Sequence, residues 1–166
     1  MVTTFTDKAA LQAASAEWIS ARLSDAIARR GSAVFMASGG RTPGPIYQEL
    51  SQQDLDWASV WIGLTDERWV DVDHEASNGA MVERTLLQNK AAAADYTPMK
   101  LSGDDAFASV DALSELYLEA YTTDVMLLGM GPDAHTLSWF AGGRGYEDAV
   151  SADAVKPVAA VEAIES

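Results

Sequence analysis

The sequence predicts an α/β fold, doubly wound, with a mostly parallel sheet and helices on both of its faces. Short apolar runs without polar alternation, such as 33–37 and 60–64, are typical of strands buried on both faces of a parallel sheet. They alternate with longer segments whose apolar positions recur at helical spacing, as in doubly wound sheets. At 166 residues the chain is long enough for one domain with a sizeable core.

The first elements follow from capping residues and apolar periodicity. A helix begins after Thr6, carries apolar positions at helical spacing and ends before Gly31. The buried strand 33–37 follows, and a glycine-rich turn leads into a helix over 43–50 with Thr42 as its N-cap. A strand, a glycine turn and a helix start together form a geometry that binds anions.

The remaining elements continue this alternation. They are, in chain order, a strand over 60–64, a helix over 78–88 capped by Asn78, a short strand over 96–101, a helix begun by Asp104 or Asp105 and carrying apolar residues to 120, a strand over 125–128, a helix starting at Thr136, and a strand over 157–161. Three unusual loops, 38–43, 65–68 and 129–136, all leave carboxyl ends of strands. We therefore expect them to share one edge of the sheet.

Composition excludes several classes of partner. Eleven basic residues against 25 acidic ones give a formal charge of −14, so the overall field repels nucleic acids and anionic membrane surfaces. The chain has no cysteine, hence no thiolate nucleophile, and it shows neither a leader nor an apolar run of membrane-spanning length. We expect a cytoplasmic protein that binds neither nucleic acid nor membrane; the sequence gives no indication of its oligomeric state.

The turn from Ser38 to Thr42 is a candidate anion site. Gly39 and Gly40 offer unobstructed backbone N–H groups at a helix start, and Arg41 adds positive charge, which together suit a phosphate group. The glycines fit a tight turn without a ligand equally well, and the motif lacks the lysine of a P-loop. Both interpretations stay open on this motif alone.

Asp66, Glu67 and Arg68 directly follow the strand over 60–64. Asp66 is a carboxylate able to orient a group or accept a proton, and the Arg68 guanidinium can bind phosphate through two parallel hydrogen bonds. The alternative is a surface ion pair. The position at the end of a buried strand, rather than on a helix face, favours a functional role.

His135 is the candidate proton-transfer group, because an imidazole titrates near neutral pH. It follows a glycine turn and Asp133, whereas His74, the other histidine, lies in a polar segment that we interpret as a solvated loop. No pair of histidines has metal-ligand spacing, so we expect no metal site.

The histidine loop has a second interpretation. Residues 129–134 match the dinucleotide fingerprint G-x-G-x-x-G/A after a strand. We favour the proton-transfer interpretation, because Asp133 would place a negative charge beside a pyrophosphate. In addition, no clear βαβ unit with a ribose-binding acid follows the match.

Three motifs taken together resemble the 6-phosphogluconolactonase family. They are, in chain order, Ala37-Ser38-Gly39-Gly40-Arg41-Thr42-Pro43, Asp66-Glu67-Arg68-Trp69-Val70 followed by Ser77-Asn78, and Leu128-Gly129-Met130-Gly131-Pro132-Asp133-Ala134-His135-Thr136. That family belongs with the glucosamine-6-phosphate isomerases in one sugar-phosphate superfamily. The Asp-Glu-Arg and His-Thr forms resemble its lactonase branch. The resemblance implies a Rossmann-like fold of the sugar-phosphate isomerase type.

The resemblance implies hydrolysis of 6-phospho-D-glucono-1,5-lactone to 6-phosphogluconate, in the oxidative pentose phosphate pathway, with neither a metal nor an organic cofactor. It implies His135 as the main acid/base, and Asp66 as the group that orients the site or shares in proton transfer. The residues it implies for binding the sugar phosphate are Ser38, Gly39, Gly40, Arg41, Thr42, Arg68, Gly131 and Asp133. Two other functions stay open: a non-catalytic sugar-phosphate-binding domain, and an enzyme like glucosamine-6-phosphate deaminase or isomerase.

The chain departs from the family pattern at three points. Ala134 stands where the family usually has glycine, and at a positive φ an alanine costs roughly 1–2 kcal/mol. Arg41 stands where the family commonly has serine. Family members also extend beyond the position of Ser166. We therefore expect residues 1–166 to form a single sugar-phosphate-binding catalytic domain that lacks the C-terminal part of the family fold.

Overall fold

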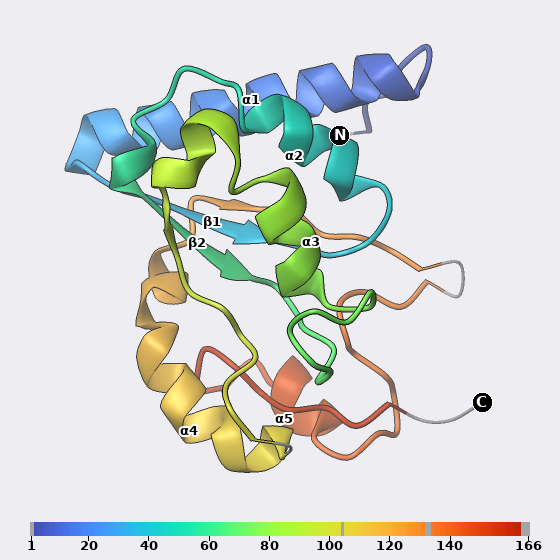
Figure 1. Ribbon diagram of the computed structural model, residues 1–166. Helices are drawn as coiled ribbons and strands as arrows, with labels where there is room; N and C mark the ends of the chain where they lie inside the picture. Colours follow the sequence, from blue (N-terminus) through green and yellow to red (C-terminus); the bar gives the residue numbers. More distant parts are fainter. Residues whose placement is uncertain (1, 104, 132–133, 164–166) are drawn as a thin grey trace.

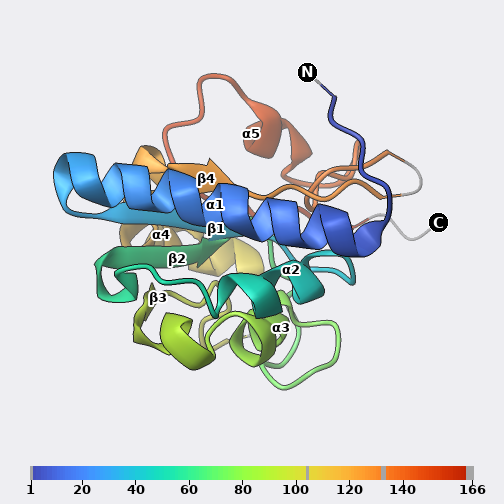
Figure 2. The same cartoon turned by 90° about the horizontal axis from the view of Figure 1, so that it is seen from above.

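The computed structural model describes residues 2–103, 105–131 and 134–163. It contains a four-stranded parallel sheet in the order β3-β2-β1-β4, and Figure 2 shows the strands following one another in this order. The strands are β1 (Ala33–Ala37), β2 (Val60–Leu64), β3 (Asp95–Tyr96) and β4 (Val125–Met126). The strands β1 and β2 have the bounds predicted from their unbroken apolar runs.

Helices cover both faces of this sheet. They are α1 (Lys8–Arg30), α2 (Pro43–Leu50), α3 (Asn78–Thr85), α4 (Ala106–Leu116) and α5 (Tyr146–Val150), with short 3₁₀ turns over Trp57–Ser59, Asn89–Ala93 and Leu118–Thr122. Figure 1 shows α1, α2 and α3 on one side of the sheet and α4 and α5 on the other. The predicted doubly wound architecture is confirmed.

The side chains of β1 explain the two layers. Ala33, Phe35 and Ala37 belong to the larger core cluster with residues of α1, α2 and α3. Met36, whose side chain points to the opposite face, packs in a smaller cluster with Leu113 and Tyr117. Every residue of β1 is buried, because apolar layers cover the strand from both sides.

The strand order fixes where a ligand is expected. The chain runs outward from β1 to β2 and β3, then returns through α4 to place β4 on the other side of β1. The topological switch point therefore lies between β1 and β4. In open α/β sheets the ligand crevice forms at such a point, outside the carboxyl ends of the strands.

The predicted strand over 125–128, buried on both faces, is wrong in length and in burial. Only Val125 and Met126 pair with β1, and the side chains of Met126 and Leu128 are 48% and 50% exposed. The reason is position: β4 is an edge strand, and no described residue pairs with its free side. An unbroken apolar run indicates a strand buried on both faces only where other elements cover both faces.

Two other predicted strands also differ. The strand over 96–101 is reduced to Asp95–Tyr96, which pairs with β2. Residues 157–161 form no strand and instead lie against the loop near α5, where Glu162 N–H donates to the Arg144 carbonyl oxygen at 2.9 Å.

Helix caps fall one residue from two predicted positions. Asp7 rather than Thr6 caps α1, and Ser77 rather than Asn78 caps α3, its hydroxyl accepting from Ala80 N–H. The helix α3 also ends at Thr85, short of 88, and a 3₁₀ turn follows. Asp105 caps α4, one of the two predicted alternatives. Among the described helices, none has the length and apolarity to cross a membrane.

Candidate functional site

The carboxyl ends of β1 and β2 lie side by side. Ala37 pairs in register with Leu64, and Thr65 N–H donates to the Ala37 carbonyl oxygen at 2.9 Å. The glycine turn and the Asp66 loop therefore leave the sheet at the same edge, as we expected from the strand-end rule.

Asp66 is also joined to the loop that follows β4. The Ser138 hydroxyl donates to Asp66 Oδ2 at 2.7 Å, across 72 residues of sequence. Ser138 lies three residues beyond His135, so this contact brings the histidine loop to the Asp66 carboxylate. The segment just beyond the third predicted loop thus meets the second loop, which follows β2, at the carboxyl edge of the sheet.

Asn78, at the start of α3, connects Asp66 to the glycine turn. Its side-chain amide donates to the Asp66 carbonyl oxygen at 2.8 Å and lies 3.4 Å from Asp66 Oδ1. A Cβ at Gly39 would lie only 1.7 Å from Asn78 Oδ1, so a residue other than glycine at position 39 would displace this amide. The buried Asn78 side chain therefore binds the Asp66 loop and lies directly against the glycine turn.

Glu67 is adjacent to Asp66 in the sequence, but its carboxylate binds the start of α3. Its carboxylate accepts hydrogen bonds from the N–H groups of Asn78 and Gly79, both at 2.8 Å, and from the Ser77 hydroxyl at 3.1 Å. A carboxylate at a helix N-terminus satisfies free N–H groups and interacts favourably with the helix dipole. Glu67 is a structural residue by this geometry.

Tyr47 of α2 holds the glycine turn in place. Ser38 N–H donates to the Tyr47 hydroxyl, and that hydroxyl donates to the Ser38 carbonyl oxygen, both at 2.9 Å. Burial raises the pKa of Tyr47, so it keeps its proton and donates throughout the neutral range. The Ser38 side chain is buried, and its hydroxyl has no hydrogen-bond partner among the described residues.

Gly40 takes a backbone conformation that favours glycine, with φ at 103°. Gly39 and Gly40 therefore both have a conformational or steric role in the turn. Their N–H groups nevertheless donate to no described residue, which leaves them available to an anion. The two interpretations of the glycines, an anion site and a tight turn, are therefore compatible.

A hollow of about 290 Å³ lies between the glycine turn and α3. Its lining residues are Gly40, Arg41, Gly44, Arg68, Glu75, Ala76, Ser77, Asn78, Met81 and Arg84. We call it the arginine hollow, because three of these side chains are guanidinium groups. It brings together Arg41 and Arg68, two of the residues predicted to bind phosphate. Thr42 starts α2 nearby but makes no side-chain cap bond.

His135 lies half-buried in a strained loop, and the predicted helix at Thr136 is wrong. Thr136 forms an antiparallel bridge with Met130, and His135 accepts a hydrogen bond at its carbonyl oxygen from Gly131 N–H at 2.9 Å. Ala134 and Leu137 have positive φ values of 68° and 58°. These left-handed residues turn the chain back on itself and prevent a helix from starting.

The His135 ring packs near Phe140, with 5.3 Å between ring centroids. Asp133, predicted to contribute to the site, lies outside the described residues. His74 behaves as the solvated loop residue that we expected: it is exposed, and its Nδ1 accepts from Ala76 N–H at 3.0 Å.

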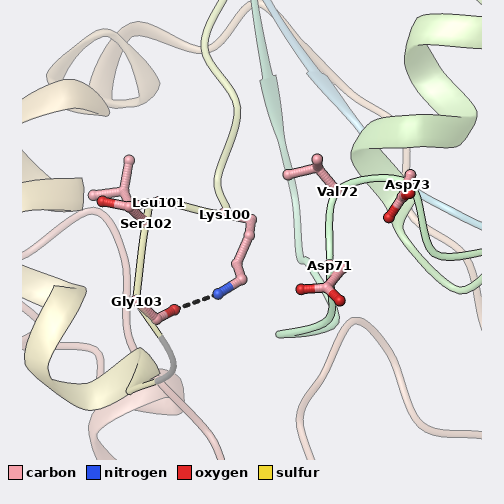
Figure 3. A pocket seen from close by; sticks show the side chains of 7 residues that line it. All are labelled: Asp71, Val72, Asp73, Lys100, Leu101, Ser102 and Gly103. Atoms are coloured by element: carbon pink, nitrogen blue, oxygen red, sulfur yellow. Dashed lines mark hydrogen bonds between the residues drawn. The ribbon is translucent and has the colours of Figure 1, made fainter.

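A second, larger hollow of about 490 Å³ contains none of the predicted site residues (Figure 3). It lies between the Asp71–Asp73 segment and the Lys100–Gly103 segment. Figure 3 shows the Lys100 ammonium donating to the Gly103 carbonyl oxygen, and the same group lies 4.5 Å from the centre of the Trp69 ring. With its cation already engaged and two aspartates on its wall, this hollow suits an anion less well than the arginine hollow.

Sequence reasoning did not predict the roles of Ser138 and Asn78 in the site. Ser138 and Asn78 act through contacts between distant segments, which no local pattern reveals; the only signal for Asn78 was its place after Ser77 in the second motif. Among the described residues, no group of three or more His, Asp or Glu side chains is arranged to hold a metal ion.

Comparison with known proteins extends over nearly the whole chain. The family model described as glucosamine-6-phosphate isomerases/6-phosphogluconolactonase matches residues 6–164. A 6-phosphogluconolactonase of Rhizobium meliloti is 38% identical over 160 residues, covering 96% of this chain and 69% of that protein. One of Mesorhizobium japonicum is 43% identical over 139 residues, covering 82% of this chain and 58% of that protein.

Solved structures give the same result. The crystal structure of a 6-phosphogluconolactonase from Shewanella baltica matches with a TM-score of 0.86 at 38% identity, covering 90% of this chain and 64% of that one. The chain thus spans between 58% and 69% of the length of these three relatives.

Proposed function

Because the chain belongs to the family of glucosamine-6-phosphate isomerases and 6-phosphogluconolactonases, we propose that it hydrolyses 6-phospho-D-glucono-1,5-lactone to 6-phosphogluconate. The relatives named above are all 6-phosphogluconolactonases, which favours lactone hydrolysis over conversion of an amino-sugar phosphate. The substrate is a sugar phosphate, and the proposal requires neither a metal nor an organic cofactor.

The observation that carries the proposal is that two side chains, Ser138 and Asn78, link segments that follow different strands of the sheet. Ser138 connects the histidine loop to Asp66, and Asn78 connects Asp66 to the glycine turn. These contacts support the proposal that an acid/base group, a carboxylate and a set of anion-binding groups from distant parts of the chain form one site. Ester hydrolysis of an anionic sugar needs this combination.

In the proposed reaction, His135 removes a proton from a water molecule as that water attacks the C1 carbonyl carbon of the lactone. The bond between C1 and the ring oxygen then breaks, and His135 returns the proton to that oxygen, giving a carboxylic acid and a free hydroxyl group. Asp66 orients the reacting groups or shares in the proton transfer. The glycine turn and Arg68 hold the phosphate, and Thr42, Gly131 and Asp133 are proposed to complete the substrate site.

A direct test measures lactone hydrolysis by the purified chain against the spontaneous rate. The proposal predicts faster hydrolysis with the wild-type chain and a large loss with His135→Ala. Equal rates for the two proteins would reject His135 as the acid/base. Wild-type hydrolysis at the spontaneous rate would reject the lactonase function.

One observation favours a second candidate, a sugar-phosphate-binding domain without turnover. Ala134, directly before His135, has a φ of 68°, and backbone strain directly before the imidazole is the ground for a candidate in which His135 does not reach a productive geometry. Calorimetry with 6-phosphogluconate separates the candidates, since binding without turnover supports the second one. An ammonia-release assay with glucosamine 6-phosphate tests the deaminase alternative.

A further inference from the structure

We propose that Arg84 of α3 is a third phosphate-binding arginine, acting with Arg41 and Arg68 across the arginine hollow, and that this hollow selects a phosphate dianion. The inference rests on the proposed function and deepens it. It names a residue outside the three sequence motifs that binds the negatively charged phosphate group of the substrate. Arg84 was not among the residues that the sequence indicated.

The packing of α2 against α3 brings Arg84 to the hollow. A Cβ at Gly44 would lie 3.8 Å from Thr85 Cγ2, an ordinary van der Waals distance, so the first turn of α2 lies close to the last turn of α3. Arg84, one residue earlier on α3, lines the hollow together with Gly40 and Arg41 from the glycine turn. Three guanidinium groups therefore line the same hollow: one from the loop after β1, one from the loop after β2 and one from α3.

The charge distribution around the hollow is unusual for this chain. Acidic residues outnumber basic ones by 25 to 11, and four basic side chains form ion pairs with aspartates: Arg22, Arg30, Lys90 and Lys156. Arg41, Arg68 and Arg84 form no ion pair with a described residue, as is also true of Lys8, Arg29, Lys100 and Arg144; what distinguishes the hollow is that three such cations line one space. Glu75 is the one carboxylate among the lining residues, so three arginines and one glutamate give the lining a net charge of +2.

The start of α2 explains why arginine side chains are needed there. The first N–H groups of a helix are free to bind an anion, but Pro43 and Pro45 have no N–H group. The helix therefore offers fewer donors than a usual anion-binding N-terminus. Guanidinium groups supply planar pairs of donors that match phosphate oxygens, and they remain charged at all relevant pH values.

The test uses Arg84→Gln, with Arg29→Gln as a matched control that removes the same charge. Arg29 lies in the last turn of α1, which precedes the amino end of β1, whereas the hollow lies beyond the carboxyl end. Titration calorimetry measures binding of 6-phosphogluconate, inorganic phosphate and gluconate to the full chain. A charge-assisted contact at an open site predicts that Arg84→Gln weakens binding of the two phosphate compounds about 3- to 30-fold.

The inference also predicts a weaker dependence of phosphate binding on salt in Arg84→Gln, and partial recovery of affinity in Arg84→Lys, which keeps the charge without the planar donors. Arg29→Gln should bind as the wild type does. Equal effects of Arg84→Gln and Arg29→Gln would overturn the inference, as would a wild-type chain that binds neither phosphate compound.

Binding and turnover separate the inference from the proposed function. A chain that binds 6-phosphogluconate through Arg84 but does not hydrolyse the lactone supports the inference and rejects the lactonase. A chain that hydrolyses the lactone but binds equally well after Arg84→Gln supports the lactonase and rejects the inference.

Discussion

Replacing Ala134 by glycine should stabilise the protein. Ala134 has a φ of 68°, a left-handed conformation in which the Cβ of an L-residue crowds the following carbonyl oxygen. That crowding costs roughly 1–2 kcal/mol, and glycine removes it. Because Ala134 is exposed, its methyl group contributes little burial that the substitution would lose.

The expected gain is smaller than the strain itself. Glycine loses more backbone freedom on folding than alanine does, by about 0.5–1 kcal/mol, and this offsets part of the relief. The net increase in the free energy of unfolding is therefore about 0–1.5 kcal/mol, with a central value of about 0.75 kcal/mol. For a domain of this size the central value corresponds to a rise in Tm of roughly 1.5–3 °C.

Urea and thermal unfolding, followed by circular dichroism, measure this change. Ala152→Gly is the matched control, since Ala152 is also exposed but has no positive φ. The control should lower the free energy of unfolding by about 0.5–1 kcal/mol, because it loses backbone freedom without relieving strain. If Ala134→Gly destabilises the chain as much as Ala152→Gly does, the assignment of strain to position 134 is wrong.

Three further substitutions test the proposed site. His135→Ala should lower kcat for lactone hydrolysis by about 10²–10⁴-fold, the usual contribution of a general acid/base, and steady-state kinetics with the Tm as a folding control will show it. Ser138→Ala should lower kcat by roughly 10-fold with little change in KM, because it removes a hydrogen bond to the Asp66 carboxylate. Ser138→Thr keeps the hydroxyl group, so an equally large loss of kcat in that variant would contradict this role of Ser138. Gly39→Ala should weaken 6-phosphogluconate binding and lower the free energy of unfolding by about 1–3 kcal/mol, because the alanine Cβ would overlap Asn78 Oδ1. Unchanged binding in calorimetry would argue against the contact between the glycine turn and Asn78.

The parts of the fold that sequence predicted well are those set by local patterns. The runs 33–37 and 60–64 are strands with the predicted bounds, because covered faces on both sides demand continuous apolar side chains. The run 125–128 has the same pattern, yet only two of its residues pair, since strand pairing depends on neighbours that the run itself does not encode.

The site divides in the same way. The motifs carrying Arg41 and Arg68 were recognisable because their residue types suit phosphate, and the structure brings both to one hollow. The contacts of Ser138 and Asn78 join distant segments, and the left-handed conformation at Leu137 overrides the local preference for a helix after His135. Tertiary contacts of this kind have no periodic signature in sequence.

The free side of β4 has a consequence for how this chain behaves in solution. No described residue pairs with this edge, half-exposed Met126 and Leu128 lie beside it, and such an edge is a template on which other chains can add strands. A formal charge of −14 repels other copies of the chain and thereby opposes such addition, but dissolved ions screen that repulsion. A higher ionic strength therefore favours edge-to-edge association, and a lower one keeps the chains apart.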